Sequence, residues 1–246
     1  MKIALMGDIH ANLPALTAVL AHAELNGAEE FWNIGDFIGY GPFPNEVIDQ
    51  VRKIRSLSVI GNYDRKVLRF SEKATNWRKN KLPDKFIAFK WAFEQLTPEN
   101  RIYLSNLPET LQFTRGKWEI LITHASPDDP KEHLYPNTPN ARLRELAQNH
   151  PVDIIVCGHS HQPFARLVDH TLFINTGSVG RPDDGDPRAC YALLNLESNT
   201  YDVHHYRVEY PVAQIVDAIK ALLLPEHFAR MFIQGRNLEA ILKESG

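Results

Sequence analysis

The sequence predicts an α/β fold, and three observations support that prediction. Within residues 1–64, short apolar runs alternate with segments whose apolar residues recur at helical spacing. Each apolar run is too short for a helix and is followed by a glycine and a polar side chain, which is typical of a buried parallel strand. From residue 165 onward, alternating apolar and polar residues indicate a second, mainly antiparallel sheet.

Three strands and two helices are expected in the first part of the chain. The strands are Lys2–Met6, Phe31–Ile34 and Leu57–Ile60. The first helix is capped by Asn12 and ended by Gly27, and the second spans 45–55 with its apolar residues on one face. By the right-handed crossover rule the three strands lie parallel, so their carboxyl ends meet at one edge of the sheet.

The remaining chain is expected to contain a helical insertion, further strands and a helical tail. Residues 65–108 are polar with aromatic anchors and are interpreted as an insertion beside the site, with their lysines and arginines on a solvated face. A loop at 125–140 leads to a short helix at 141–148, and the tail at 211–246 is helical. We expect residues 1–246 to form a single domain. The later strands are expected at Leu111–Thr114, Trp118–Thr123, Val152–Cys157, Ala165–Val168, Leu172–Asn175, Ala189–Leu196 and Thr200–Val208.

The composition is that of a soluble globular protein, with 43% hydrophobic and 23% charged residues among 246. The formal net charge of −3 gives no support to a sequence-independent nucleic-acid binder. Two cysteines, Cys157 and Cys190, make neither a disulfide framework nor a zinc-binding pair. The apolar start is too short for a signal peptide, and no apolar run could span a membrane, so a cytoplasmic location is expected.

Seven side chains able to bind metal follow the predicted strands at the points where the strands end. Taken alone, Asp8 is more simply interpreted as a helix cap, and each histidine as a hydrogen-bonded structural residue. Their shared position after strand ends predicts a metal site instead. Seven oxygen and nitrogen ligands are too many for one tetrahedral zinc and suit two ions bridged by Asp36. The seven are Asp8, His10, Asp36, Asn62, His124, His159 and His161.

The order of these motifs is highly specific, although each motif alone is not. They are Gly7-Asp8-Ile9-His10, Gly35-Asp36, Gly61-Asn62-Tyr63-Asp64, His124 and Gly158-His159-Ser160-His161. Over about residues 2–208 the set resembles the calcineurin-like metallophosphoesterases. That resemblance implies a four-layer α/β/β/α sandwich of two mixed β-sheets flanked by helices.

The resemblance also implies how the ligands divide between two ions. Asp8, His10, Asp36 and His161 would bind the first ion, while Asp36, Asn62, His124 and His159 would bind the second. Two such ions generate a bridging hydroxide that attacks phosphorus in line, and they neutralise the phosphoryl oxygens. Because none of the seven predicted ligands is a thiolate, manganese or iron is expected, with zinc or cobalt as alternatives.

Two positions depart from the family pattern. Tyr63 stands where the family usually has the histidine that protonates the leaving oxygen, with Asp64 beside it; Asp36, Asn62, Tyr63 and Asp64 are the candidate catalytic residues. A phenol, with a reference pKa of about 10, is a poor proton donor at neutral pH, so we expect substrates such as anhydrides or activated esters. Tyr40 follows Gly39 where protein phosphatases of the superfamily carry Asp-Arg, which disfavours a phosphoprotein phosphatase.

Several residues outside the motifs receive weaker assignments. Arg181 or Arg188 is a candidate phosphate contact, with a merely solvated loop as the alternative. Asn175 is a candidate support for the metal ligands, and Cys157 is interpreted as a small buried residue. Histidines without a strand-end position are expected to be structural or exposed: His133, His150, His170, His204 and His205.

The predicted function is a dinuclear metal-dependent phosphoesterase. Its substrate would be a small molecule with a phosphodiester or phosphoanhydride, such as a nucleotide or a dinucleoside polyphosphate. A nuclease of the same fold is an alternative that the acidic balance disfavours. A non-catalytic metal-binding scaffold is a second alternative, although such a protein would be expected to have lost ligands. We expect neither a nucleic-acid nor a membrane partner, and the sequence leaves the oligomeric state open.

Overall fold

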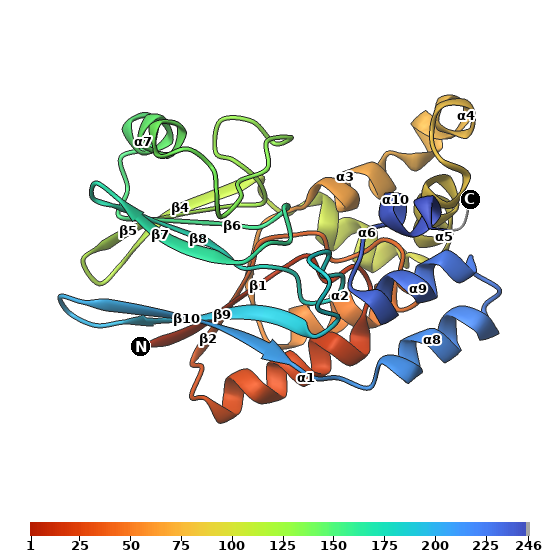
Figure 1. Ribbon diagram of the computed structural model, residues 1–246, viewed down its shortest axis with the longest axis horizontal. Coiled ribbons are helices and arrows are strands. Elements are labelled where there is room, and N and C mark those ends of the chain that lie inside the picture. The colour runs from red at the N-terminus through yellow and green to blue at the C-terminus, as the bar shows by residue number, and fades with distance from the viewer. Residues whose placement is uncertain (245–246) are drawn as a thin grey trace.

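Two mixed β-sheets of five strands each, with helices on their outer faces, make up the computed structural model, which describes residues 1–244 (Figure 1). The strand order is β10-β9-β1-β2-β3 in the first sheet and β4-β5-β6-β8-β7 in the second. This arrangement confirms the predicted α/β sandwich. Within the described residues, no helix has the length and apolar character needed to cross a membrane.

The first sheet contains the three predicted parallel strands. β1 (Lys2–Met6) pairs in parallel with β2 (Glu30–Asn33), which pairs in parallel with β3 (Leu57–Ser58). β3 ends two residues earlier than expected, because the Ile60 amide leaves the sheet and donates to the carbonyl of Pro108. The shared direction of these strands puts their carboxyl ends at one edge, as the crossover rule predicts.

The expectation for the last four strands was partly wrong. β9 (Ala189–Leu196) and β10 (Tyr201–Val208) belong to the first sheet, where β9 pairs antiparallel with β1. Almost every residue of β9 is buried, which suits a central strand covered on both faces. β7 (Phe164–Val168) and β8 (Thr171–Asn175) lie in the second sheet, and β8 runs parallel to β6 (Ile154–Cys157).

The other edge of the second sheet is the predicted hairpin. β4 (Thr110–Arg115) and β5 (Trp118–Thr123) are antiparallel and turn at Gly116, whose φ of 62° is in the left-handed region. β5 also pairs in parallel with β6. The second sheet is therefore mixed rather than mainly antiparallel.

The core lies in layers that follow the alternation of side chains along the strands. In β1, Ile3 and Leu5 pack between the sheets against residues of the second sheet such as Ile122. Ala4 and Met6 point the other way, into the cluster under the helices. A third cluster covers the outer face of the second sheet beneath α7 (Asn140–Asn149).

Helices cover the outer faces and extend beyond the sheet edge that carries the site. The predicted insertion begins earlier than residue 65, because Asn62 starts α3. The tail beyond residue 211 is helical as far as it is described, and residues 245–246 of that prediction lie outside the described residues. The other helices are α1 (Leu13–Leu25), α2 (Pro44–Lys53), α3 (Asn62–Leu68), α4 (Phe70–Asn80), α5 (Pro83–Gln95), α6 (Pro98–Ser105), α8 (Val212–Ala221), α9 (Glu226–Gln234) and α10 (Leu238–Lys243).

The tail and the insertion meet beside the site. Lys85 of α5 forms an ion pair of 2.9 Å with Glu239 of α10, and Asp84 pairs with His227 of α9 at 2.6 Å. In Figure 1, α10 lies next to α5, although about 150 residues separate them in the chain. Segments from the middle and the end of the sequence thus border the same cleft.

Candidate metal centre

The predicted metal-binding residues lie where the carboxyl ends of the two sheets face each other. Five of the seven fall into two compact groups, in each of which the ligand atoms lie within 4.8 Å of one another. The first group is Asp8, His10 and His161, and the second is Asp8, Asp36 and His124. Both groups are fully buried and combine residues from both sheets.

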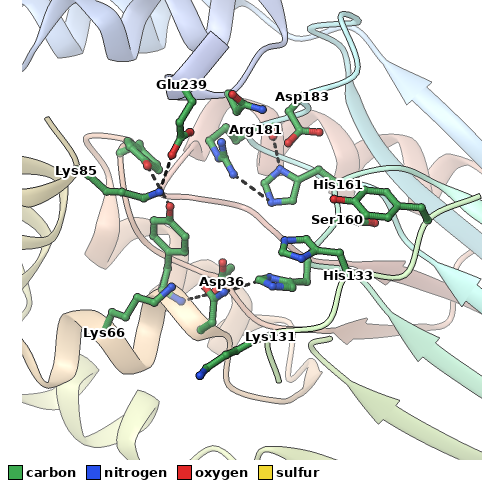
Figure 2. A pocket seen from close by; sticks show the side chains of 16 residues that line it. Asp36, Lys66, Lys85, Lys131, His133, Ser160, His161, Arg181, Asp183 and Glu239 are labelled. Carbon is green, nitrogen blue, oxygen red and sulfur yellow. Dashed lines mark hydrogen bonds and ion pairs between the residues drawn. The ribbon is translucent and has the colours of Figure 1, made fainter. Parts of the chain in front are cut away.

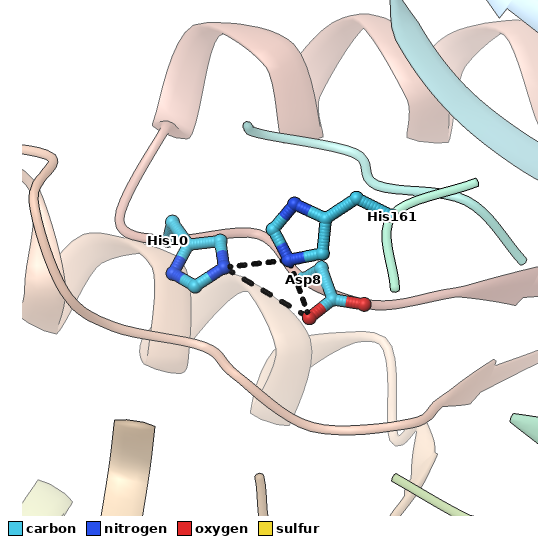
Figure 3. A group of neighbouring side chains, drawn as sticks. All are labelled: Asp8, His10 and His161. Atoms are coloured by element: carbon cyan, nitrogen blue, oxygen red, sulfur yellow. Dashed lines mark hydrogen bonds and ion pairs between the residues drawn. The ribbon is translucent and has the colours of Figure 1, made fainter. Parts of the chain in front are cut away.

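The first group is held by three side chains whose ligand atoms converge (Figure 3). His10 Nε2 lies 3.3 Å from His161 Nε2. Asp8 Oδ1 lies 3.2 Å from the same nitrogen of His161 and 3.8 Å from that of His10. Two ring nitrogens and a carboxylate oxygen aimed at one point match the ligand set of a divalent transition metal.

Asp36 belongs to the second group and also faces the first. Its Oδ2 is 3.8 Å from His10 Nε2 in the first group, and its Oδ1 is 3.6 Å from His124 Nε2 in the second. The Tyr63 amide donates to Oδ1 at 2.7 Å and fixes the orientation of the carboxylate. Each oxygen thus faces a different group, which is the geometry a bridging carboxylate needs.

Asn62 and His159 lie beside the second group rather than within it. The Asn62 amide nitrogen is 3.1 Å from His159 Nδ1, and the His159 ring centroid is 4.9 Å from that of His124. Both residues border the open cleft. The structure therefore brings all seven predicted donors to one place, with these two on its accessible side.

The backbone at these residues is strained. Five of the seven donors have a positive φ, a conformation that non-glycine residues seldom adopt. Such conformations persist only where surrounding structure enforces them, and they cluster at functional sites. The residues are Asp8 (49°), His10 (50°), Asp36 (55°), His159 (65°) and His161 (58°).

Glycines before the donors allow the loops to approach closely. A Cβ at Gly61 would lie 2.1 Å from Asp36 Oδ1, and one at Gly158 would lie 2.6 Å from Asp8 Oδ2. Neither contact is sterically allowed. The glycine of the Gly-Asn motif is therefore required by packing between two loops of the first sheet, and the glycine of the Gly-His motif by packing between the two sheets.

Hydrogen bonds at Nδ1 orient His124 and His161 so that Nε2 faces the ligand groups. His124 Nδ1 donates to the carbonyl of Ile34 at 2.8 Å, and His161 Nδ1 donates to the carbonyl of Arg181 at 2.6 Å. In each ring Nε2 then carries the lone pair that a metal would take.

Unpartnered polar atoms at the centre support metal binding. Among the described residues, Asp8 Oδ1, Asn62 Oδ1 and His124 Nε2 are buried without a hydrogen-bond partner. Unsatisfied buried polar atoms are rare in proteins because they cost free energy. The donor set and its free atoms fit divalent ions.

Burial and mutual charge favour the metal-binding forms of three ligands, His10, His159 and Asp8. Burial, and next the charge of Arg181, hold the pKa of His10 well below its usual range. Burial and neighbouring imidazoles lower the pKa of His159 to about 2. Burial acts to raise the pKa of Asp8, but attraction to His161 and the other imidazoles outweighs it and keeps that pKa low. Neutral imidazole and ionised carboxylate are the forms that bind metals.

The capping interpretation of Asp8 is wrong. Asn12 caps α1, because its side chain accepts the Ala15 amide at 3.2 Å. Asp8 Oδ2 instead accepts the backbone amide of His159 at 2.9 Å.

A cleft of about 410 Å³ opens over the donors (Figure 2). Two of its lysines, Lys66 and Lys85, belong to the insertion, whose basic residues were expected on a solvated face. For these two lysines that expectation was wrong. Lys66 lies one helical turn after Asn62, so Asn62 and Lys66 face the same side of α3. The cleft is lined by Asp36, Tyr40, Asn62, Tyr63, Lys66, Lys85, Lys131, His133, Tyr135, His159, Ser160, His161, Arg181, Asp183, Asn237 and Glu239.

His133 and the two candidate arginines are also placed by the structure. His133 is exposed, as expected, but it also lines the cleft and stacks on His159 with ring centroids 4.0 Å apart. Arg181 lines the cleft, whereas Arg188 forms an ion pair of 2.6 Å with Asp186 and does not. Nothing in the residue pattern of the loop before α7 indicates that it returns to the site, because that pattern is irregular.

Comparison with known proteins identifies the family. Residues 1–199 match the sequence model of the calcineurin-like phosphoesterase superfamily domain. The chain belongs to this superfamily. It is therefore a metal-dependent phosphoesterase, which confirms the resemblance and the enzyme class expected from the sequence.

Relatives of this phosphoesterase cover most of its length. An uncharacterised protein of Methanocaldococcus jannaschii is 31% identical and aligns with 95% of this chain and 98% of its own. Phosphodiesterase YfcE of Escherichia coli is 26% identical over 79% of this chain and 88% of its own. The crystal structure of a metallophosphoesterase from Sphaerobacter thermophilus has a TM-score of 0.76 at 32% identity and covers 96% of this chain and 100% of its own.

Asp64 and Tyr63 belong to the same motif as Asn62, but they do not take part in the two ligand groups. Asp64 is fully buried and does not line the cleft; its carboxylate accepts the backbone amides of Gly61 and Asp36, each at 2.9 Å. Burial, and then the charge of Asp36, raise its pKa well above the usual range. Asp64 thus supports the loops that carry Asp36 and Asn62.

Tyr63 lies at the base of the cleft. Its hydroxyl is 3.0 Å from that of Tyr40, and its ring meets the His10 ring edge-on at a centroid distance of 5.1 Å. Burial, followed by the nearby Tyr40, raises the pKa of Tyr63 well above 10. The phenol is held neutral and gives up its proton even less readily than a free tyrosine.

Proposed function

We propose that this phosphoesterase binds two divalent ions and hydrolyses a phosphodiester or phosphoanhydride of a small molecule, such as a nucleotide or dinucleoside polyphosphate. The observation that carries the proposal is the pair of buried ligand groups, with one oxygen of Asp36 facing each. Asp8, His10, Asp36 and His161 would hold one ion, and Asp36, Asn62, His124 and His159 the other. Manganese or iron suits these ligands, as do zinc and cobalt.

When bound, two such ions activate water for attack on phosphorus and neutralise the phosphoryl oxygens. The protein supplies the rest of the site. Arg181 Nη2 lies 3.4 Å from His161 Nε2, so its guanidinium can bind an oxygen of a phosphoryl group placed over the ligands. Asp64 fixes the loop amides, and Asp36 fixes the spacing between the two groups.

The leaving group must depart with little help from Tyr63. Water adds its oxygen to phosphorus, the bond from phosphorus to the leaving oxygen breaks, and that oxygen leaves with the electron pair. A phosphate or aryl oxide is stable as an anion, whereas an alkoxide needs a proton. The high pKa of Tyr63 therefore supports anhydrides and activated esters as substrates.

The two alternatives are less well supported. A nuclease of the same fold needs a wide cationic surface, and this chain has a formal charge of −3. A non-catalytic scaffold has no need for seven converging donors, free ligand atoms and a cationic cleft.

The test is metal-dependent turnover together with metal content. Protein stripped with a chelator and reloaded with manganese should hydrolyse bis(p-nitrophenyl) phosphate and contain two equivalents of metal. A single bound equivalent with full activity would refute the dinuclear assignment. Absence of turnover in protein that does bind metal would favour the scaffold.

A further inference from the structure

Arg181 is a buried cation without a close ion-pair partner among the described residues. It is only 7% exposed, and its Nε has no hydrogen-bond partner within residues 1–244. In that range no ion pair of 4.0 Å or less includes it. Its guanidinium lies 5.3 Å from the Tyr40 ring centroid and borders the cleft. A buried charge without a close ion pair is costly, so this position is explained if an anion arrives from the cleft.

Two lysines add positive charge on the same side of the cleft. Lys66, on α3, forms no ion pair among the described residues, and its ammonium lies 4.9 Å from the Tyr63 ring centroid. Burial lowers the pKa of Lys66, and repulsion from Lys81 and Lys85 adds to the effect. Lys66 and Lys85 both line this cleft. Figure 2 shows Lys66 and Lys85 on the left of the cleft, opposite His133 and Ser160.

Glu239 is the carboxylate that pairs with Lys85 on this side of the cleft. It pairs with Lys85 at 2.9 Å, and it is half exposed, so it can move away at little cost. The Lys85 ion pair, with a further contribution from Arg181, lowers the pKa of Glu239 despite partial burial that acts to raise it. The carboxylate therefore stays charged at neutral pH and lies near the position that a bound anion would take.

We propose that Arg181, Lys66 and Lys85 bind a second anionic group of the substrate beside the phosphoryl group at the metal ligands, and that Glu239 leaves Lys85 when that group binds. Arg181 can reach both positions, because its Nη2 lies 3.4 Å from His161 and it lines the same cleft as Lys85 and Glu239. The planar fork of a guanidinium suits two adjacent phosphoryl groups.

This inference rests on the proposed function and narrows its substrate class. A lone phosphodiester has one negative charge and would leave the second position unfilled. A phosphoanhydride has two or more adjacent charged phosphoryl groups, and its leaving phosphate needs little protonation. The site is accordingly that of a phosphoanhydride hydrolase, acting on a molecule with a di- or polyphosphate chain.

The test compares inorganic pyrophosphate with inorganic phosphate as ligands of the manganese-loaded protein, by calorimetry. We expect pyrophosphate to bind at least about tenfold more tightly, since about 1.4 kcal/mol of added contact suffices. Lys85→Gln should reduce pyrophosphate affinity by a larger factor than phosphate affinity. Lys90→Gln, on the exposed face of the same helix, is the matched control and should change neither.

Glu239→Gln gives an effect of the opposite sign. Removing the competing charge should tighten pyrophosphate binding several-fold, whereas Glu94→Gln on α5 should not change it. A purely structural role for the ion pair would weaken binding in both Lys85→Gln and Glu239→Gln, and that result would overturn the proposal. Equal affinities for pyrophosphate and phosphate in the wild type would overturn it as well.

The same samples separate this inference from the proposed function. If bis(p-nitrophenyl) phosphate is hydrolysed but pyrophosphate shows no preference, the second anion position is wrong and the phosphoesterase assignment stands. If pyrophosphate binds through Lys85 but no substrate is turned over, the anion position stands and the proposed catalysis fails.

Discussion

Asp8 Oδ2 accepts the backbone amide of His159 at 2.9 Å, a hydrogen bond that joins the end of β1 in one sheet to the end of β6 in the other. The second oxygen of Asp8 has no hydrogen-bond partner in the described structure and faces His10 and His161. A single carboxylate thus both fixes the spacing between the sheets and contributes to the ligand groups. Changes at this contact should therefore affect stability and metal binding together.

Gly158→Ala tests that coupling. The new Cβ would lie 2.6 Å from Asp8 Oδ2 and 2.2 Å from Ile34 Cδ1, so we expect a loss of about 1–3 kcal/mol in the free energy of unfolding. Urea denaturation measures that loss, and metal analysis should show reduced metal content. Gly185→Ala is the control, because its Cβ meets nothing within 4 Å. The left-handed φ at residue 185 costs about 1 kcal/mol when alanine is introduced, but the metal content of the Gly185→Ala variant should be normal. Normal metal content in Gly158→Ala would contradict the coupling.

Asp36→Asn tests the bridge. Asparagine keeps the shape but offers one oxygen instead of two, so we expect turnover to fall by more than about a hundredfold, exceeding the usual effect of a residue behind the ligands. Metal content should fall to one equivalent or less. Asp49→Asn, an exposed aspartate on α2, serves as the control. A variant at position 36 that keeps most of its turnover would refute the bridging role.

Local patterns in the sequence were sufficient to locate the donors. An apolar run, a glycine and a polar residue occur within a few positions, so the ends of β1, β2 and β6 could be recognised from neighbouring residues alone. The meeting of these ends follows from a general rule for parallel strands. That is why the seven donors could be predicted as one group.

Features that depend on distant contacts could not be predicted. Nothing in the alternation of β9 indicates which sheet it joins, because its partner β1 is almost 190 residues away. The support that Asp64 gives depends on amides of Gly61 and Asp36, which come together only in the folded chain. His133 lies in an irregular loop, and Glu239 reaches the cleft from a tail helix.

The stabilising contribution of the loop that carries His133 should depend on pH, because a cluster of charged residues around Arg142 holds this loop. Arg142 pairs with Glu132 at 2.7 Å and with Asp128 at 3.2 Å. The hydrogen bond from Arg142 lowers the pKa of Glu132. For Asp128, burial acts to raise the pKa, but hydrogen bonds from His150 and its neighbours outweigh it and lower the pKa.

Since both pKa values are depressed in the folded state, the stabilisation is fully present above the unfolded pKa values of about 4 and is lost as pH falls through the folded values. Arg142→Gln should therefore lower the free energy of unfolding by about 1 kcal/mol at pH 7 and by less below pH 4. Urea denaturation at the two pH values measures the difference. Arg144→Gln, which breaks a more exposed pair with Asp169, should have a smaller effect at pH 7. An Arg142→Gln effect that is equal at both pH values would contradict the ionic origin.

Tyr63→His tests whether residue 63 limits protonation of the leaving group. Burial and Tyr40 keep the phenol neutral, so the wild type should be much slower on an ester with an alkoxide leaving group than on one with p-nitrophenoxide. An imidazole at this position has a reference pKa of about 6.5 and can donate a proton at neutral pH, which contributes about 10²-fold or more where the geometry is right. We expect the variant to gain on the alkoxide substrate relative to the aryl substrate, measured as the ratio of the two kcat/KM values. Tyr63→Phe removes the hydroxyl without adding a donor and should leave that ratio close to that of the wild type. If Tyr63→His also leaves the ratio unchanged, the identity of residue 63 does not set the preference for leaving groups.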